Sequence, residues 1–210
     1  VYPRPVVQIK PLGSTSFCAG GSVELDAGPG FASYLWTPGG ATTRKITVNS
    51  SGSYSVSVTD LNGCSAQSLG VSVVVNPLPV PTITPGGPTT FCEGGQVTLD
   101  AGTGFAQYLW SNGSNTRSIS VTAPGSYSVT VWTGAGCSGT SAAVTVSVNL
   151  PPAPKVVALE ATTFCNGDSV HLDAGTGYSS YLWSNGRRTQ IITVKNPGTY
   201  AVTVTDANGC

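Results

Sequence analysis

The chain has 210 residues with no net charge, and only 9% of them are charged, against roughly 25% in an average domain. A nucleic-acid partner would require a basic patch, which a neutral chain lacks. Membrane insertion is also not expected, because the sequence has neither a basic stripe nor an apolar run of ~20 residues.

Three copies of one motif follow one another along the chain. They begin at Phe17 (FCAGGSVELDAG), Phe91 (FCEGGQVTLDAG) and Phe164 (FCNGDSVHLDAG). A period of about 73 residues is too long for one supersecondary unit, but it suffices for a small domain. We therefore predict a tail and linker at 1–10, repeat 1 at 11–76, repeat 2 with its leading linker at 77–149, and repeat 3 at 150–210.

Each repeat shows the same series of short alternating segments. In repeat 1 these are SVELDA, YLW, KITV and SYSVSVT, in which Val, Leu and Tyr alternate with polar residues. Alternation with period two is typical of half-buried strands, and the intervening Asn-Gly pairs favour tight turns. Six or seven short strands per repeat predict an all-β two-sheet sandwich.

The last predicted strand is present in two repeats only. The runs SVVV near Val73 and AVTVSV from Ala143 follow the second cysteine of repeats 1 and 2, but repeat 3 has no such run. We expect this strand of repeat 3 either to come from a segment outside the 210 residues or to be disordered. We also expect the chain to be part of a longer protein.

Two cysteines recur at matching positions in every repeat. Repeat symmetry favours three disulfides within repeats, which would be Cys18–Cys64, Cys92–Cys137 and Cys165–Cys210. Zinc is disfavoured, because it would require about four ligands per site and each repeat offers two distant thiols. Disulfides imply an oxidising compartment, so we expect an extracellular or cell-surface protein.

The order of these residues resembles the immunoglobulin fold. A cysteine is followed by a tryptophan on a strand (Trp36, Trp110 and Trp183) and by a Gly-x-Tyr motif that ends at Tyr54, Tyr127 and Tyr200. These tyrosines stand where that fold has its tyrosine corner. The second cysteine comes ten residues after the tyrosine, rather than two. The resemblance therefore implies a disulfide at one end of the sandwich and tryptophans that pack on aliphatic side chains.

More closely, the pattern FCxGxSVxLDAGxGxxxYLWSNG…ITV…GxYxVTVTDxNGC resembles the Ig-like repeats of type IX-secreted surface proteins of Bacteroidetes. That family includes giant gliding adhesins and multi-domain polysaccharide-degrading enzymes. Between the motifs lie proline-rich segments at Pro77–Pro81 and Pro151–Pro154. Such segments favour extended geometry and act as semi-rigid spacers. We expect a tandem array of three Ig-like domains on stiff linkers.

No group of residues predicts catalysis, a cofactor or a metal. The single histidine, His171, aligns with Glu24 and Thr98 and is expected to face solvent from a strand. Asp26, Asp100 and Asp173 recur in LDAG, but calcium usually requires several clustered carboxylates. Turn capping is the favoured role of these aspartates.

Trp132 is the one unusual aromatic residue, because it aligns with threonines on the polar side of a strand. An exposed tryptophan could stack on a sugar ring or anchor a partner. The alternative is a contact with a linker or a neighbouring domain.

The favoured function is a structural stalk in a long cell-surface adhesin or filament that presents a distal binding tip. One alternative is a spacer region in a secreted polysaccharide-degrading enzyme, and another is a set of carbohydrate-binding repeats. Expected partners are the neighbouring Ig-like domains of the same chain, the secretion or anchoring machinery and, for the third case, glycans.

Overall fold

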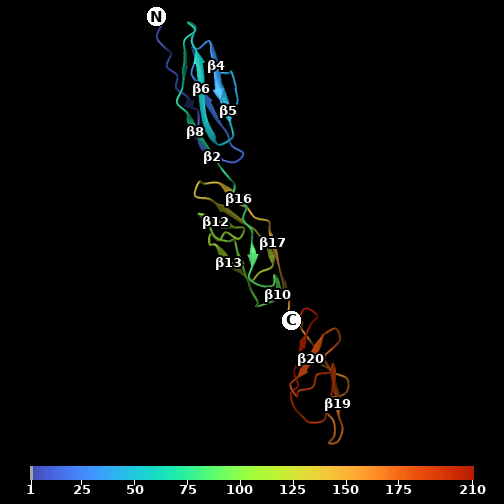
Figure 1. Cartoon of the computed structure of the whole chain (residues 1–210). Helices are drawn as coiled ribbons and strands as arrows, with labels where there is room; N and C mark the ends of the chain where they lie inside the picture. Colours follow the sequence, from blue (N-terminus) through green and yellow to red (C-terminus); the bar gives the residue numbers. More distant parts are fainter. Residues whose placement is uncertain (1) are drawn as a thin grey trace. The chain divides into compact units, whose positions relative to one another are not determined.

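The computed structural model describes residues 2–210. All helices and strands found in that range are β-strands, and no helix is among them (Figure 1). The predicted all-β class is confirmed. The chain forms two compact units, and repeat 2 contributes strands to both. Unit 1 contains residues 1–83, 101–117 and 128–142, and unit 2 contains residues 84–100, 118–127 and 143–210.

Repeat 1 forms two sheets within unit 1. The first has the order β1 (Lys10–Pro11), β3 (Val23–Asp26), β5 (Lys45–Val48). The second has the order β2 (Ser16–Cys18), β8 (Val71–Asn76), β6 (Gly52–Thr59), β4 (Ser33–Thr37), and β7 (Ser65–Gln67) also pairs with β6. An immunoglobulin-like sandwich divides its strands in this way, with A, B and E in one sheet and C, F and G in the other.

Both sheets of repeat 1 contribute to one core. Leu25 of β3, Trp36 of β4 and Val56 of β6 are at most 1% exposed, and they belong to a single cluster of buried residues. Alternation explains this, because every second side chain of a strand points to the same face. The indole Nε1 of Trp36 donates to the carbonyl of Thr43 at 2.8 Å. The cluster contains no cysteine, as expected for a tryptophan packed on aliphatic side chains.

The strands of repeat 2 form three sheets. In unit 1 the order is β12 (Gln107–Trp110), β15 (Val129–Trp132), β16 (Ser138–Thr140). In unit 2 one sheet has the order β9 (Thr84–Pro85), β11 (Val97–Asp100), β13 (Ser118–Val121). The other has the order β10 (Thr90–Cys92), β17 (Val144–Asn149), β14 (Gly125–Tyr127).

Repeat 3 lies within unit 2 and has fewer strands. One sheet has the order β18 (Val157–Ala158), β19 (Val170–Asp173), β21 (Ile191–Val194). In the other, β20 (Ser180–Trp183) pairs with β22 (Val202–Thr205). Trp183, which is 1% exposed, lies in a core with Leu172 and Ile192. Within the described residues, repeat 3 has no strand equivalent to β8 or β17.

The predicted tyrosine corner is confirmed in all three repeats. The hydroxyls of Tyr54, Tyr127 and Tyr200 each donate to the carbonyl four residues upstream, in every case at 3.0 Å. A second tyrosine contact recurs that the sequence patterns did not predict. In each repeat a tyrosine hydroxyl donates at 2.9 Å to the carbonyl oxygen of the glycine that follows the LDA motif. The donors are Tyr34, Tyr108 and Tyr181.

Candidate functional site: disulfides between successive repeats

The cysteines pair between repeats rather than within them. Cys18 of repeat 1 is bonded to Cys137 of repeat 2, and Cys92 of repeat 2 is bonded to Cys210 of repeat 3. The Cα–Cα distance is 5.5 Å in both. Cys64 and Cys165 are free. The predicted pairs Cys18–Cys64, Cys92–Cys137 and Cys165–Cys210 are therefore wrong.

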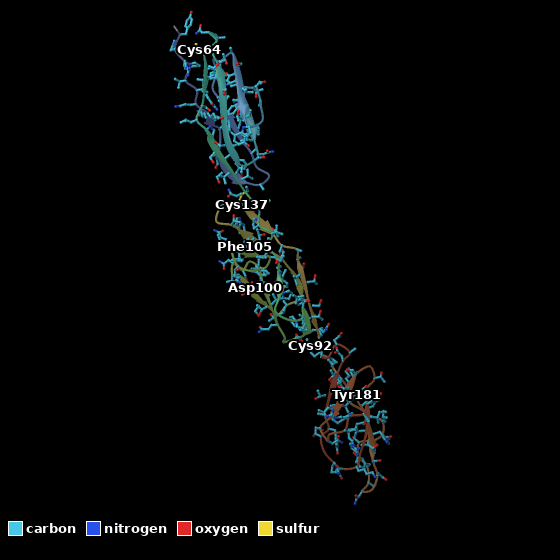
Figure 2. All side chains as sticks on the ribbon, viewed as in Figure 1. Cys64, Cys92, Asp100, Phe105, Cys137 and Tyr181 are labelled. Atoms are coloured by element: carbon cyan, nitrogen blue, oxygen red, sulfur yellow. A yellow bond between two sulfur atoms is a disulfide. The ribbon has the colours of Figure 1, made fainter. Side chains whose placement is uncertain are left out.

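Strand geometry explains the failure of the Cys18–Cys64 pair. Cys18 lies opposite Asn76 at the end of β8, three residues beyond the pairing of Val73 with Gly52 at the start of β6. Cys64 follows the other end of β6, an eight-residue strand that is about 26 Å long at ~3.3 Å per residue. Figure 2 shows Cys64 at the far end of repeat 1 from Cys137, the residue to which Cys18 is bonded.

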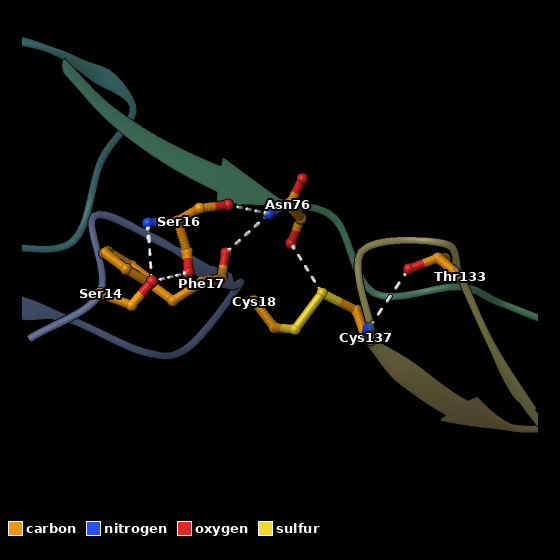
Figure 3. Close-up of a disulfide and its surroundings, with 7 residues drawn as sticks. All are labelled: Ser14, Ser16, Phe17, Cys18, Asn76, Thr133 and Cys137. Atoms are coloured by element: carbon orange, nitrogen blue, oxygen red, sulfur yellow. Dashed lines mark hydrogen bonds between the residues drawn. A yellow bond between two sulfur atoms is a disulfide. The ribbon is translucent and has the colours of Figure 1, made fainter.

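Parallel pairing with the last strand of the repeat holds Cys18 in place. The segment β2 runs beside β8, and Phe17 and Cys18 lie opposite Val75 and Asn76. The side-chain amide of Asn76 donates to the carbonyl of Phe17 at 3.3 Å and to the hydroxyl of Ser16 at 3.1 Å (Figure 3). The amide of Ala19 donates to the carbonyl of Asn76 at 2.8 Å. Hydrogen bonds therefore hold the end of β2 to the end of β8 beside Cys18.

A tight turn presents the partner, Cys137. The turn spans Thr133–Cys137, and its ends are joined by a backbone hydrogen bond from Thr133 N to Cys137 O at 2.9 Å. The hydroxyl of Thr133 accepts the amide of Cys137 at 3.2 Å (Figure 3). The Sγ of Cys137 lies 4.0 Å from the carbonyl oxygen of Asn76, and the residue is only 1% exposed. The Cys137 half of this disulfide is therefore buried, and the half-buried Cys18 completes the contact between a strand end and a turn.

The chain that links the two repeats packs beside this disulfide. A Cβ placed on Gly139 of β16 would overlap the carbonyl oxygen of Pro79 and lie 3.0 Å from its carbonyl carbon. Only glycine allows the two backbones to approach this closely. The start of the linker, which follows Asn76, is thus in contact with the strand that follows Cys137. Such a contact restrains the linker at this point.

The same arrangement recurs at Cys92 and Cys210 in unit 2. Cys92 lies opposite Asn149 at the end of β17, and the Sγ of Cys210 lies 4.0 Å from the carbonyl oxygen of Asn149. Here Asp206 takes the place of Thr133, and its Oδ1 accepts the amides of Cys210 at 2.8 Å and Asn208 at 2.9 Å. These hydrogen bonds, the one from Cys210 first, lower the pKa of Asp206.

The two free cysteines are the counterparts of bonded ones. Cys64 corresponds to Cys137 and Cys210, and its turn is built in the same way, since Asp60 Oδ1 accepts the amide of Cys64 at 2.8 Å. Cys165 corresponds to Cys18 and Cys92 and is exposed, whereas Cys64 is half-buried. Cys64 therefore lies in a turn of the kind that presents Cys137 and Cys210. Cys165 lies at the position that Cys18 and Cys92 hold in the other repeats.

The aspartates of the LDAG motif cap turns where their contacts are described. Oδ1 of Asp26 accepts the amide of Gly28 at 2.8 Å, and Arg44 donates to both carboxylate oxygens at 2.8 and 2.7 Å. The hydrogen bond from Arg44 is the main cause that lowers the pKa of Asp26. In repeat 3, Oδ1 of Asp173 accepts the amide of Gly175 at 2.8 Å. Asp100 of β11 lies opposite Ser118 of β13.

His171 lies on β19 with 44% of its side chain exposed, as a solvent-facing strand residue should. Its Nδ1 is 2.9 Å from a carboxylate oxygen of Glu160, and its backbone amide donates to the other oxygen at 2.7 Å. The latter hydrogen bond is the first cause that lowers the pKa of Glu160. Residues 2–210 contain no group of three His, Cys, Asp or Glu that could hold a metal ion.

Trp132 is half-buried, whereas the sequence suggested an exposed tryptophan that could stack on a sugar ring or anchor a partner. It ends β15 in the middle of its sheet, between Gln107 of β12 and Ser138 of β16. Its carbonyl accepts the amide of Ala106 at 2.7 Å. Trp132 therefore has a neighbouring strand on each side, unlike a residue on an edge strand.

Comparisons with known proteins give the chain no family. No family model matches it, and no curated protein matches it. Among solved structures, murine CEACAM1b is 14% identical, with a TM-score of 0.36, over 69% of this chain and 100% of that one. The human OSCAR ligand-binding domain is also 14% identical, with a TM-score of 0.30, over 68% of this chain and 99% of that one.

A third structure, mouse coronavirus receptor-binding domain complexed with its murine receptor, is 13% identical with a TM-score of 0.36, over 69% of this chain and 100% of that one. Likenesses this low say nothing about what the present chain binds. The Ig-like topology is instead defined by the strand pairing of repeat 1. Across the described residues, no helix is long and apolar enough to cross a bilayer.

Proposed function

We propose that the chain is a load-bearing segment of an extracellular stalk. In this proposal its three repeats are tandem Ig-like domains on proline-rich linkers, and they hold a distal binding tip away from a cell surface. The setting that the sequence resemblance suggests is a type IX-secreted adhesin of a gliding bacterium, with no enzymatic activity in this segment. Its immediate partners would be further Ig-like domains of the same chain and the secretion or anchoring machinery.

The observation that carries the proposal is the covalent topology. The disulfides Cys18–Cys137 and Cys92–Cys210 enclose overlapping stretches of chain. Three covalent routes that use a disulfide therefore connect Cys18 to Cys210. One crosses to Cys137 and follows 73 residues to Cys210, and another follows 74 residues to Cys92 and then crosses to Cys210. The shortest crosses to Cys137, runs back along 45 residues to Cys92 and crosses again to Cys210.

The parallel routes mean that at least two covalent bonds must break before Cys18 and Cys210 separate. They also limit extension. At ~3.6 Å per residue, the 45-residue route with its two disulfides limits the distance between Cys18 and Cys210 to about 170 Å, whereas the reduced chain reaches about 690 Å. Disulfides inside single repeats would leave every linker as the only covalent connection. Bonds that span successive repeats are thus suited to a structure that bears tension.

Single-molecule stretching of the chain by its two ends tests the mechanical part. We expect complete unfolding of the oxidised chain to extend the Cys18–Cys210 segment to no more than about 170 Å, and reductant to raise this limit to about 690 Å. Equal extension in both states would refute the shared-load topology. The control is the Cys18→Ser and Cys92→Ser double variant, which should behave in oxidising buffer as the reduced wild type does.

The cellular part is tested by the intact mass of the native polypeptide, denatured, from isolated cell surface. A mass of several hundred kilodaltons would support a stalk of many such repeats. A mass near one hundred kilodaltons would contradict it and favour the role of a spacer beside a catalytic domain.

A further inference from the structure

The chain contains five Asn-Gly pairs, and one of them lies in its turn differently from the others. The asparagines are Asn62, Asn112, Asn166, Asn185 and Asn208. An asparagine followed by glycine is prone to deamidation, because no side chain shields the glycine amide. The reaction requires this amide nitrogen to attack the carbonyl carbon of the asparagine side chain. The place of the glycine in its turn therefore decides whether the nitrogen is available.

In four of the pairs the glycine is the last residue of the turn, and its amide closes that turn. Each of these amides donates to the carbonyl oxygen three residues upstream, at 2.8 to 3.2 Å. The donors are Gly63, Gly113, Gly186 and Gly209. Attack on the neighbouring asparagine would cost each of them the hydrogen bond that holds its turn together.

Asn166 and Gly167 instead occupy the two central positions of their turn. The amide of Asp168 closes this turn by donating to the carbonyl oxygen of Cys165 at 3.1 Å. Gly167 has a φ of 104°, and a positive φ is what the third residue of a type II turn requires. Its own amide donates no hydrogen bond within residues 2–210. Of the five glycine nitrogens, this is the one that is available for attack.

The side chain of Asn166 is unrestrained as well. The residue is exposed, and its side chain has no hydrogen bond in the described part of the chain. By contrast, Oδ1 of Asn112 accepts the amide of Ser114 at 3.1 Å. In the same way, Oδ1 of Asn185 accepts the amide of Arg187 at 3.2 Å. These bonds hold the side chain in one orientation, whereas that of Asn166 is free to turn its carbonyl carbon towards the attacking nitrogen.

We infer that Asn166 is a site of spontaneous deamidation. The nitrogen of Gly167 loses its proton to solvent and attacks Cγ of Asn166, so that an N–Cγ bond forms. The Cγ–Nδ2 bond breaks, and the side-chain nitrogen takes a proton from solvent and leaves as ammonia. Water then opens the resulting succinimide ring at either of its carbonyl groups. The product at position 166 is aspartate or isoaspartate, according to which carbonyl the water attacks.

The two products differ in their effect on the turn. Glu93 holds the equivalent position in repeat 2, where the amide of Gly95 closes the same turn onto Cys92 at 2.9 Å. A carboxylate side chain is thus compatible with this turn. Isoaspartate adds a methylene group to the backbone between Cys165 and Asp168, and it thereby moves apart the two groups that close the turn. Deamidation therefore loosens, irreversibly, the segment that leads from Cys165 into β19.

Peptide mapping by mass spectrometry tests the site on the full 210-residue chain, kept in mildly alkaline buffer and sampled over time. We expect Asn166 to lose its amide about tenfold faster than the other four asparagines, which is the factor that one backbone hydrogen bond provides. In denaturant with reductant, where no turn persists, the five rates should become similar.

Hydrogen exchange tests the effect on the turn. The amide of Asp168 should exchange faster in the isoaspartyl form than in the fresh protein, because its hydrogen bond to Cys165 is lost. The Asn166→Asp variant is the matched control, since it carries the same added charge on a normal backbone. Its Asp168 amide should exchange as it does in the wild type.

Equal rates at the five sites in the folded chain would overturn the inference. A preference for Asn166 of the same size in the denatured chain would also overturn it, because the cause would then be the neighbouring residues and not the turn. Unchanged exchange of Asp168 in the isoaspartyl form would refute the loosening. None of these outcomes depends on the proposed stalk, since the reaction involves one turn of repeat 3.

Discussion

Cys18 and Cys137 are separated by 119 positions in the sequence, yet their Cα atoms lie 5.5 Å apart and their sulfurs are bonded. The first is at the end of a short strand, and the second is at the end of a tight turn in the next repeat. The same pair of local structures meets at Cys92 and Cys210. This relationship leads to the following predictions.

Disulfide mapping should distinguish the two modes of pairing directly. After alkylation of the native chain and digestion without reduction, mass spectrometry should find Cys18 linked to Cys137 and Cys92 linked to Cys210. Cys64 and Cys165 should carry the alkyl group, because neither has a partner in the chain. A peptide in which Cys18 is linked to Cys64 would contradict this structure.

Loss of one disulfide should destabilise the chain, whereas loss of a free thiol should not. Cys18→Ser opens a loop of 119 residues, for which the chain-entropy model gives at most about 5 kcal/mol of unfolding free energy. Cys64→Ser is the matched control, because Cys64 has the same intermediate burial and no bond. Urea denaturation in oxidising buffer measures both, and the difference should vanish in reductant. An equal effect of both substitutions would argue against the bond.

A methyl group on Gly139 should disturb the contact between β16 and the linker. The new Cβ would overlap the carbonyl oxygen of Pro79, and because backbone must then move, we expect a loss of about 1–3 kcal/mol. Gly134→Ala is the control, since a Cβ there meets nothing within 4 Å, and its effect should stay within about 0.5 kcal/mol. Thermal denaturation compares the two variants. Faster reduction of Cys18–Cys137 in the Gly139→Ala variant would provide independent support.

Acid should remove the stabilisation that Asp206 provides to the turn that carries Cys210. The pKa of Asp206 is lowered in the folded chain, so folding favours the carboxylate over its protonated form. This contribution is complete above the ordinary aspartate pKa of about 3.9 and is lost as the pH falls through the lower folded value.

Asp206→Thr provides the comparison for that experiment, because threonine holds the same place at Thr133 and accepts the same amide without titrating. The denaturation midpoints of the wild type and the variant are measured at several pH values from neutral to pH 2. The difference between the two midpoints should be smallest at the acidic end. A constant difference across that range would show that the carboxylate has no titrating role in stability.

Much of the local structure was predictable from the sequence. Alternation around Val56 and Val58 predicted a half-buried strand, and the Gly-x-Tyr motif predicted the hydrogen bond that Tyr54 makes to Ser50. Such features depend on residues within a few positions of one another, so a short window of sequence contains the cause. The core tryptophans and the turn-capping role of Asp26 belong to the same class.

The disulfide pairing was not predictable in this way. A period of about 73 residues is satisfied equally well when each cysteine pairs within its repeat and when it pairs with the next one. Only the direction of β6, which places Cys18 and Cys64 at opposite ends of the strand, separates the two cases. The contact of Gly139 with Pro79 and the half-buried state of Trp132 likewise depend on strands that come from distant parts of the chain.

The sequence by itself therefore determined the β-strands, their turns and the repetition of both, because these follow from neighbouring side chains and backbone preferences. Tertiary structure alone decided which cysteines meet and how far Trp132 is buried. Bond formation requires two Cβ atoms to approach within a few ångströms, and burial requires a neighbouring strand. Both conditions are set by the packing of segments that are distant in the sequence.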